Sequence, residues 1–438
     1  MLDRLLSLET FGIKLGLENI ARLCEGLGHP ERSFTSLHVA GTNGKGSVTA
    51  MVHAALQASG LRTARYTSPH LADITERFVI GDAPVDTPTF DAVARDVLDL
   101  ADRLEASGAL RVSPTFFEAT TAIAFELFRR AGTEVAVIEV GLGGRFDATN
   151  VITPVAGAIT TIGFDHQQHL GHSLAEIAFE KAGIIKAGTP VVAGWLPGEA
   201  MDVVRRVARE RDATLLEAAG DTAIEASMVE GAAYLTLATP TGRYGPLTLA
   251  LRGEHQVRNA AVAVRLLETA GRAGVAISHQ AIVHGLTKAT WPARLEALRL
   301  RDGGQVILDA AHNAEGAAAL ADYLGRWHPE RPALVVGVMR DKDTAAIVEP
   351  LLPRVSTIVA TEAPTPRALP AAELEARLWT AVQRLSAESR PEISREDDPL
   401  TAVNRALASN PVVVVAGSIF LVGPVRERLV PRTIVPTP

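Results

Sequence analysis

Six consecutive small or polar residues, between a short apolar run and a helix-like stretch, could bind a phosphate group. The segment LHVAGTNGKGSVTAMVHAAL, residues 37–56, contains Thr42, Asn43, Gly44, Lys45, Gly46 and Ser47. Glycines let backbone N–H groups approach phosphate oxygens, a helix N-terminus favours negative charge, and a lysine can bridge terminal phosphates. The usual spelling GxxxxGK[ST] is not kept, because Val39 holds the first glycine position and Gly46 separates Lys45 from Ser47. The segment therefore predicts a variant nucleotide-binding loop, with an ordinary glycine-rich turn as the alternative.

Three further segments place possible metal ligands after short apolar runs. Glu139 ends the run VAVIE, His166 follows TTIGFD, and Ser68 stands in YTSPHL. A carboxylate at the end of a buried strand commonly holds Mg²⁺ near the β- and γ-phosphates. Glu139 could instead cap a helix or form a surface ion pair, and a single histidine or serine carries little weight alone. If these segments end parallel strands of one sheet, they meet at the edge where ligands bind in such folds.

The elements that would position these residues alternate between strand-like and helix-like patterns. Apolar positions spaced three and four apart after the loop predict a helix packed on a sheet. Buried helices are predicted over residues 115–132 and 258–271, and strands over 36–40, 135–141, 155–163, 189–195 and 233–240. The alternation predicts an α/β fold with a mostly parallel sheet covered by helices on both faces.

The pattern restarts near residue 291. The segment QVILDAAHNAEGAAALADYL reads as strand, turn and helix, and ALVVGVM, VSTIVATE and VVVVAGSIF read as further buried strands. We therefore expect a large N-terminal phosphate-loop ATPase-like domain over residues 1–290. A smaller C-terminal Rossmann-like α/β domain over residues 291–438 follows it, near the usual size of a domain.

Composition limits the function classes. The chain has 438 residues, of which 47% are hydrophobic and 21% charged, so a large core can form. A formal net charge of −7 argues against a general nucleic-acid-binding surface. The single cysteine, Cys24, allows no internal disulfide, and we interpret it as a packing residue. No signal peptide or bilayer-spanning run is evident, so a cytoplasmic protein without membrane contact is expected.

Seven motifs in order along the chain resemble one family. They are GTNGKGS, YTSPHL, FFEATTAIAF, EVGLGGRFDATN, GFDHQQHLG, AFEKAGIIK and LDAAHN, and the lead-in FGIKLGLENIARLCEGLGHPERSF resembles that family's N-terminus as well. Together they resemble the folylpolyglutamate synthase and dihydrofolate synthase family, relatives of the Mur peptide ligases. The spellings GKGS and GLGGRFDATN favour the folate branch over the Mur branch.

The resemblance implies an ATP-dependent ligase that forms an amide bond. ATP phosphorylates a substrate carboxylate, the amine of L-glutamate attacks the acyl phosphate, and ADP and phosphate leave. A carboxylate is a poor electrophile, and phosphorylation supplies a good leaving group. Positive charge from Mg²⁺ and Lys45 can neutralise the phosphoryl group in transfer.

The resemblance also implies the ligands of ATP and metal. Thr42 to Ser47 would form the phosphate loop, and Ser68, Glu139 and His166 match Mg²⁺ ligands. Lys181, in FEKAGII, matches a lysine that is carbamylated in the family and could help hold a second Mg²⁺ ion. Carbamylation needs a neutral amine. Without the resemblance, Lys181 would be interpreted as an exposed helix lysine.

Other matches fall on the nucleotide and on the C-terminal domain. Asn259 and Arg294 match nucleotide contacts, and Asp309 and His312 match residues that face ATP, with His312 also able to position glutamate. Asp309, at the end of an apolar strand, could equally be the N-cap of the next helix. Ser418, after another buried strand, would line the same site.

The pterin side of the site rests on two residues. Asp147, in GRFDATN, matches a residue that can bind the pterin ring, whose N–H donors suit a carboxylate. Phe116, in TFFEAT, could stack on that ring. The alternative is that Phe116 and Phe117 are core residues of a helix.

Three functions are compatible with these residues. The first is a folate-branch ligase that adds L-glutamate to dihydropteroate, to reduced folates, or to both, acting as a monomer. The second is a Mur-type ligase acting on a carboxylate outside folate metabolism, and dependence of turnover on a pterin would separate it from the first. The third is a regulatory or motor NTPase, which would need no amino-acid acceptor.

Overall fold

The computed structural model describes residues 1–8, 16–301 and 303–433 of the chain. Residues 11–15, the start of the family-like lead-in, lie outside this part. The chain divides into two compact units, each of which is described by itself. The first comprises Met1–Ala226, Tyr234–Ala250 and Gln256–Thr290, and the second comprises Ser227–Ala233, Leu251–His255 and Trp291–Pro438.

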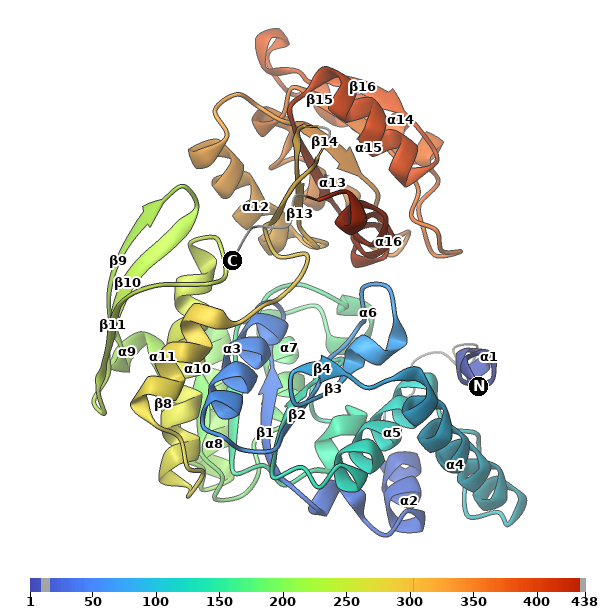
Figure 1. Cartoon of the computed structure of the whole chain (residues 1–438), viewed down its shortest axis with the longest axis vertical. Coiled ribbons are helices and arrows are strands. Elements are labelled where there is room, and N and C mark those ends of the chain that lie inside the picture. The colour runs from blue at the N-terminus through green and yellow to red at the C-terminus, as the bar shows by residue number, and fades with distance from the viewer. Residues whose placement is uncertain (9–15, 302, 434–438) are drawn as a thin grey trace. The chain divides into compact units, whose positions relative to one another are not determined.

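An eight-stranded sheet forms the centre of the first unit, with strand order β4-β3-β2-β5-β1-β6-β7-β8. Figure 1 shows β1, in blue, within this unit. Its strands are β1 (Thr35–Ala40), β2 (Thr63–Tyr66), β3 (Phe78–Ile80), β4 (Ala83–Pro84), β5 (Val135–Glu139), β6 (Ala156–Ile159), β7 (Val191–Ala193) and β8 (Leu215–Glu217). The six strands from β2 to β8 along this order are parallel, and β3 and β4 add an antiparallel edge. The predicted mostly parallel α/β fold is confirmed.

Helices of the first unit lie before, between and after these strands. They are α1 (Leu2–Leu6), α2 (Glu18–Gly26), α3 (Lys45–Ala58), α4 (Thr87–Ala106), α5 (Phe116–Arg130), α6 (Gln167–Leu170), α7 (Leu174–Ala182), α8 (Gly198–Glu210), α9 (Ala218–Asp221), α10 (His255–Arg272) and α11 (His279–Lys288). Short 3₁₀ turns include Ile74–Arg77 and Ala148–Val151.

Strand register assigns the core residues to two faces of the sheet. On one face, Tyr66 and Ile138 pack with α4 and α5, while Ile159 and Ala193 pack with α7 and α8. On the other face, α3 lies against β1, β2 and β5, and α11 packs on α3. Helices therefore cover both faces, and continuous apolar runs such as VAVIE suit strands that are buried on both sides.

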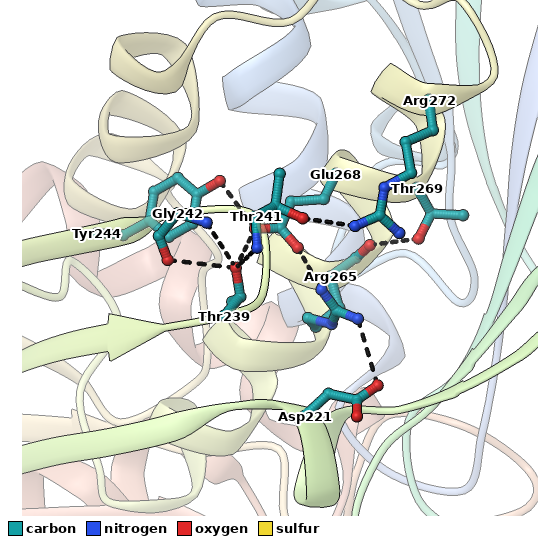
Figure 2. Close-up of polar contacts among 9 residues, drawn as sticks. All are labelled: Asp221, Thr239, Thr241, Gly242, Tyr244, Arg265, Glu268, Thr269 and Arg272. Carbon is teal, nitrogen blue, oxygen red and sulfur yellow. Dashed lines mark hydrogen bonds and ion pairs between the residues drawn. The ribbon is translucent and has the colours of Figure 1, made fainter.

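A separate three-stranded sheet has the order β11-β10-β9, with β9 at Ala223–Val229, β10 at Ala232–Ala238 and β11 at Arg243–Thr248. The prediction placed one strand here and gave no hint of the others. Side chains of α10 form hydrogen bonds with residues of this sheet (Figure 2). Glu268, buried on α10, accepts from Thr239 Oγ1 at 2.5 Å and Tyr244 Oη at 3.0 Å, and pairs with Arg265 at 2.6 Å. Arg265 also reaches Asp221, at 3.3 Å.

The second unit holds a six-stranded sheet with the order β12-β13-β17-β14-β15-β16. The strands are β12 (Glu296–Arg299), β13 (Gln305–Leu308), β14 (Ala333–Val336), β15 (Thr357–Ala360), β16 (Glu392–Arg395) and β17 (Val412–Ala416). Only β12 runs antiparallel to its neighbour among these paired strands. The helices are α12 (Ala314–Trp327), α13 (Thr344–Val348), α14 (Ala371–Val382), α15 (Pro399–Ser409) and α16 (Ile419–Leu429).

Two buried histidines of the first unit should make stability fall in acid. His38 in β1 and His53 in α3 are 0% and 3% exposed, and burial lowers the pKa of each to about 3. An unfolded histidine has a pKa of about 6.5, so between pH 6.5 and 3 the unfolded chain binds protons that the folded chain does not. Above this pH window the two histidines cost no unfolding free energy. Within it, each histidine lowers the unfolding free energy by up to about 1.4 kcal/mol for each pH unit of acidification.

Urea denaturation at several pH values between 7 and 4 would test this titration. His53→Gln should reduce the acid-side slope of the unfolding free energy by about one histidine's share. An unchanged slope in that variant would contradict the assignment of the acid loss to His53.

Candidate active site

The predicted phosphate loop joins β1 to α3, where the strand order reverses. The first strand lies between β5 and β6, so the loop stands at the switch point of the parallel sheet. Ligands bind at such points in open α/β sheets. Gly41 and Gly44 both have positive φ, +150° and +83°, and Gly44 is the N-cap of α3. The helix therefore begins at Lys45, with its N-terminus at the loop.

Hydrogen bonds fix the loop to the segment that follows β6. Thr42 N donates to Thr161 O at 2.8 Å, and Gly163 N donates to Thr42 Oγ1 at 3.0 Å. Asn43 N donates to Thr161 Oγ1 at 2.9 Å, and Thr160 Oγ1 donates to Asn43 O at 2.6 Å. Since both backbone and side chains are engaged, the loop is preorganised rather than a solvent-exposed turn.

Two lysines reach the start of the loop. Lys45 Nζ donates to Gly41 O at 3.0 Å and to Thr42 O at 3.2 Å. Lys181, in the last turn of α7, is 5% exposed, and its Nζ donates to the same Gly41 O at 2.9 Å. The reading of Lys181 as an exposed helix lysine is therefore wrong. The structure brings this residue from a distant segment to the phosphate loop.

Glu139 ends β5, the strand beside β1, and is 4% exposed. Its side chain is on the same side of the sheet as that of Arg65. Burial lowers the pKa of Arg65 to about 10, and the negative charge of Glu139 opposes that shift. Ser68 follows β2, the next strand along. His166 follows β6 as the N-cap of α6, with positive φ, and its Nε2 lies 3.8 Å from Asp165 Oδ1.

The donor types at this edge fit Mg²⁺, because a buried carboxylate and a hydroxyl beside a phosphate loop leave positions for phosphate oxygens and water. Within residues 1–8, 16–301 and 303–433, no three His, Cys, Asp or Glu side chains are grouped to hold a metal. The expected set of Ser68, Glu139, His166 and Lys181 includes only two residues of those types. A site here would therefore depend on the bound phosphates for its remaining ligands.

The first two turns of α10 lie against the loop. Asn259 is 6% exposed, and a Cβ added to Gly44 would stand 2.5 Å from Asn259 Oδ1. Gln256, fully buried, donates from Nε2 to Ser47 Oγ at 3.1 Å and accepts from Asn259 Nδ2 at 2.9 Å. Sequence reasoning missed Gln256. Its position three residues before Asn259, on one helix face, was the available signal.

Replacing Gly44 by alanine should weaken both the fold and nucleotide binding. The left-handed φ and the close approach to Asn259 together should cost about 1–3 kcal/mol of unfolding free energy. Urea denaturation and an ATP titration would measure the two effects. Gly28→Ala is the matched control, since Gly28 has φ +76° and open space around its Cβ position. Equal effects at both glycines would contradict a specific role of the Asn259 contact.

The two residues expected at the pterin lie near the same sheet edge. Asp147 is 5% exposed and accepts from Leu142 N at 2.8 Å and from Thr149 N at 3.0 Å. Burial raises its pKa, and these hydrogen bonds oppose the rise. Phe116 begins α5 and is partly buried, with the Arg77 guanidinium 5.2 Å from its ring centroid. Asp147 is therefore a structural anchor of its turn, whatever else it contacts.

The predicted residues of the second unit gather at the ends of two paired strands. Asp309 follows β13 and Ser418 follows the neighbouring β17, where Ser418 is the N-cap of α16. Asp309 accepts from Leu295 N and Ala311 N, both at 2.9 Å, and burial raises its pKa against the nearby Arg294 charge. Its suggested role as a helix N-cap is wrong, because Asn313 caps α12.

His312 lies close to this carboxylate along the chain. Its Nδ1 is 2.8 Å from Ala310 O, so the backbone carbonyl fixes Nδ1 as the protonated ring nitrogen. The same unit contains Arg294, whose charge acts on Asp309. The second unit thus carries a basic and an acidic side chain at the carboxyl edge of its sheet.

The fold and the loop define a class of protein, ATP-dependent ligases built from Mur ligase domains. Residues 111–267 match the Mur ligase middle domain, and residues 293–419 match the Mur ligase glutamate ligase domain. The Bacillus subtilis dihydrofolate synthase/folylpolyglutamate synthase is 34% identical over 96% of this chain and 96% of its own length. The chain belongs to the dihydrofolate synthase/folylpolyglutamate synthase family.

Solved structures agree over nearly the whole chain. Mycobacterium tuberculosis folylpolyglutamate synthase complexed with ADP is 32% identical, with a TM-score of 0.89 over 98% of this chain and 99% of that one. E. coli FolC in complex with DHPP and ADP is 28% identical, with a TM-score of 0.85 over 98% and 97%. The family resemblance and the fold class expected from the sequence are confirmed. No described helix is long and apolar enough to cross a membrane.

Proposed function

We propose that this chain is a bifunctional ligase that uses ATP to join L-glutamate to dihydropteroate and to reduced folates or their polyglutamates. The observation that carries the proposal is the preorganised phosphate loop at the switch point of the sheet, in a chain similar over nearly its full length to dihydrofolate and folylpolyglutamate synthases. The substrate carboxylate attacks the γ-phosphate of ATP to give an acyl phosphate and ADP. The glutamate amine then displaces phosphate to form the amide.

The first unit supplies the ATP-binding groups in this proposal. Backbone N–H groups at the start of α3 face the phosphates, and Lys45 exchanges its loop carbonyls for phosphate oxygens. Asn259 holds the nucleotide from the second turn of α10. Bound Mg²⁺, one or two ions, would neutralise charge on the phosphates and would be held by Ser68, Glu139 and His166.

Lys181 is proposed to carry a carbamate. The support is its burial beside Gly41 O, at the loop rather than in solvent. Addition of CO₂ to the neutral amine forms an N–C bond and releases one proton, which leaves a carboxylate where an ammonium stood. Such a group could hold a second cation. Intact-protein mass in bicarbonate, compared with the mass of Lys181→Ala, would detect the added CO₂.

We divide the chain into an N-terminal domain, residues 1–290, and a C-terminal domain, residues 291–438. The C-terminal domain takes part in the same reaction. Arg294 and Asp309 would face the nucleotide, and His312 would contact phosphate or orient glutamate. Ser418 would line the substrate site. The support is that Asp309 and Ser418 end paired neighbouring strands of one sheet.

Phe116 and Asp147 are proposed to bind the pterin. An aromatic face suits the planar ring, and a carboxylate suits the ring's N–H donors. We further propose that the protein acts as a monomer in the cytoplasm and binds no nucleic acid. A Mur-type ligase acting on a non-folate carboxylate is the alternative, because both domain matches of this chain are to Mur ligase domains.

Phosphate release from Mg-ATP and L-glutamate tests the function. It would be measured with dihydropteroate, with a reduced monoglutamyl folate, and with no pterin. Release only with a pterin, with a product heavier by one glutamate, is expected, and activity with both pterins would establish the bifunctional enzyme. Release at the same rate without any pterin would overturn the proposal.

A further inference from the structure

Gln256 contacts both Ser47 of the phosphate loop and Asn259 of α10 through side-chain hydrogen bonds. It is 0% exposed, so neither end of its amide is satisfied by solvent. Its Nε2 donates to Ser47 Oγ and its Oε1 accepts from Asn259 Nδ2. A buried amide with both ends engaged fixes the orientation of both partners, because reversing it would leave buried polar groups mismatched.

The bond to Ser47 sets the direction of the Ser47 hydroxyl. Ser47 Oγ accepts the Gln256 N–H at 3.1 Å, so one of its two lone pairs is occupied. What remains is one O–H donor and one lone pair. Ser47 is the third residue of α3, in the first turn, where backbone N–H groups lack acceptors within the helix and can bind an anion. Its hydroxyl proton is therefore available to a phosphate oxygen and its lone pair to a cation.

The bond to Asn259 sets the direction of the second amide. Asn259 Nδ2 donates to Gln256 Oε1 at 2.9 Å, which turns Asn259 Oδ1 toward Gly44. Without that bond the Asn259 amide could rotate and present a donor to the loop instead of an acceptor. Gln256 therefore determines that the Oδ1 atom of Asn259 faces Gly44, the N-cap of α3.

The helix that carries Gln256 is itself anchored about three turns later. Arg265 and Glu268 form a buried ion pair in α10, and Glu268 also accepts from Thr239 and Tyr244 of the small sheet (Figure 2). Side chains on rigid elements hold a site more precisely than side chains on loops. The first turn of α10 is therefore a fixed support for the amide.

We propose that Gln256 is a positioning residue for ATP, which acts by orienting the Ser47 hydroxyl and the Asn259 amide at the phosphate loop. This inference rests on the proposed function, since it takes the loop to be the ATP site. Gln256 itself need not touch the nucleotide. Its loss should weaken ATP binding and phosphoryl transfer while pterin binding is unaffected.

Two substitutions separate the two bonds. Gln256→Glu keeps an acceptor for Asn259 but cannot donate to Ser47, so the Ser47 hydroxyl would turn to donate to the carboxylate. Gln256→Met has similar size and loses both bonds. Each should raise the KM for ATP and lower kcat, about ten- to hundredfold in kcat/KM for Gln256→Met, while the KM for the pterin stays within twofold. Arg258→Gln, at an exposed position on the same helix, is the control and should match the wild type.

A double-mutant cycle shows whether Gln256 acts through Ser47. In a Ser47→Ala background Gln256→Glu should lose most of its effect on kcat/KM for ATP, because no hydroxyl remains to reorient. Full, multiplicative effects of Gln256→Glu and Ser47→Ala would overturn the proposal. So would a wild-type KM and kcat for ATP in Gln256→Glu, a variant whose near-identical shape keeps the test usable if Gln256→Met does not fold.

The outcome is distinguishable from failure of the proposed function. ATP binding by calorimetry, without pterin or glutamate, reports on the loop alone. Wild-type protein that binds ATP but shows no pterin-dependent phosphate release would refute the ligase proposal, and the same titration would still test Gln256. Unchanged ATP affinity in both Gln256 variants, in an enzyme that ligates glutamate, would refute Gln256 alone.

Discussion

Replacing Lys45 by alanine should reduce kcat for pterin-dependent phosphate release by about a thousandfold or more, as expected when a preorganised positive charge at a transferring phosphoryl group is removed. The Lys45 ammonium lies across the loop, 3.0 Å from Gly41 O, and Lys181, which donates to the same carbonyl, is held in α7 rather than at the start of α3. The backbone N–H groups of the loop and the start of α3 remain in the variant. We therefore expect ATP affinity to fall much less than kcat.

Steady-state kinetics and an ATP titration would separate the two effects. Lys288→Ala is the control, because Lys288 is exposed at the end of α11 and should leave both quantities unchanged. A variant with near-normal kcat would contradict the assignment of Lys45 to the phosphoryl group. A parallel loss of binding and rate would instead indicate that Lys45 acts in ground-state binding.

Replacing Glu268 by alanine should have the largest effect on stability, about 3–5 kcal/mol, because it removes the short, fully buried partner of the Arg265 guanidinium and leaves only the longer contact with the more exposed Asp221. The side chains of Arg265 and Glu268 are 2% and 1% exposed. Thr239 and Tyr244 would lose their acceptor as well. The neutral variant Glu268→Gln should cost less, since it keeps a hydrogen-bond acceptor.

Urea denaturation followed by a probe in the first unit would measure these differences. Glu225→Ala provides the comparison, because Glu225 pairs with Arg243 on the same small sheet at 73% and 59% exposure and should change stability by less than about 1 kcal/mol. If Glu268→Ala were no worse than Glu225→Ala, the buried pair would not be a stabilising anchor of α10.

Much of the fold follows from local pattern. Apolar runs such as VAVIE and VVVVA are strands in the structure, and the helix predicted over 115–132 is α5, Phe116–Arg130. Strands with alternating or mixed polarity were missed, among them β9, β11, β12 and β16. Most of their side chains are exposed or only partly buried. Their pairing depends on distant segments, so no strong local signal marks them as strands.

The site divides in the same way. The phosphate loop is recognisable because glycine and lysine types at fixed spacing are demanded by its backbone geometry. Lys181 and Gln256 reach the loop only through tertiary packing of α7 and α10. A lysine near the end of a helix is usually solvated, and a glutamine at the start of one has many uses. Neither residue type indicates by itself that the side chain is buried. The spacing of residues in the sequence therefore could not predict that Lys181 and Gln256 contact the loop.

The packing of α11 on α3 bears on how the chain folds during synthesis. A Cβ on Gly285 of α11 would stand 2.5 Å from Met51 O and 2.7 Å from Ala55 Cβ in α3, so the two helices touch at backbone distance. The helix that begins at the phosphate loop is made early, whereas its cover is made long after the strands beside it. A nascent chain that has left the ribosome only as far as β11 therefore exposes the small-residue face of α3. Until α11 emerges, that face is a natural target for chaperones that bind exposed apolar surface.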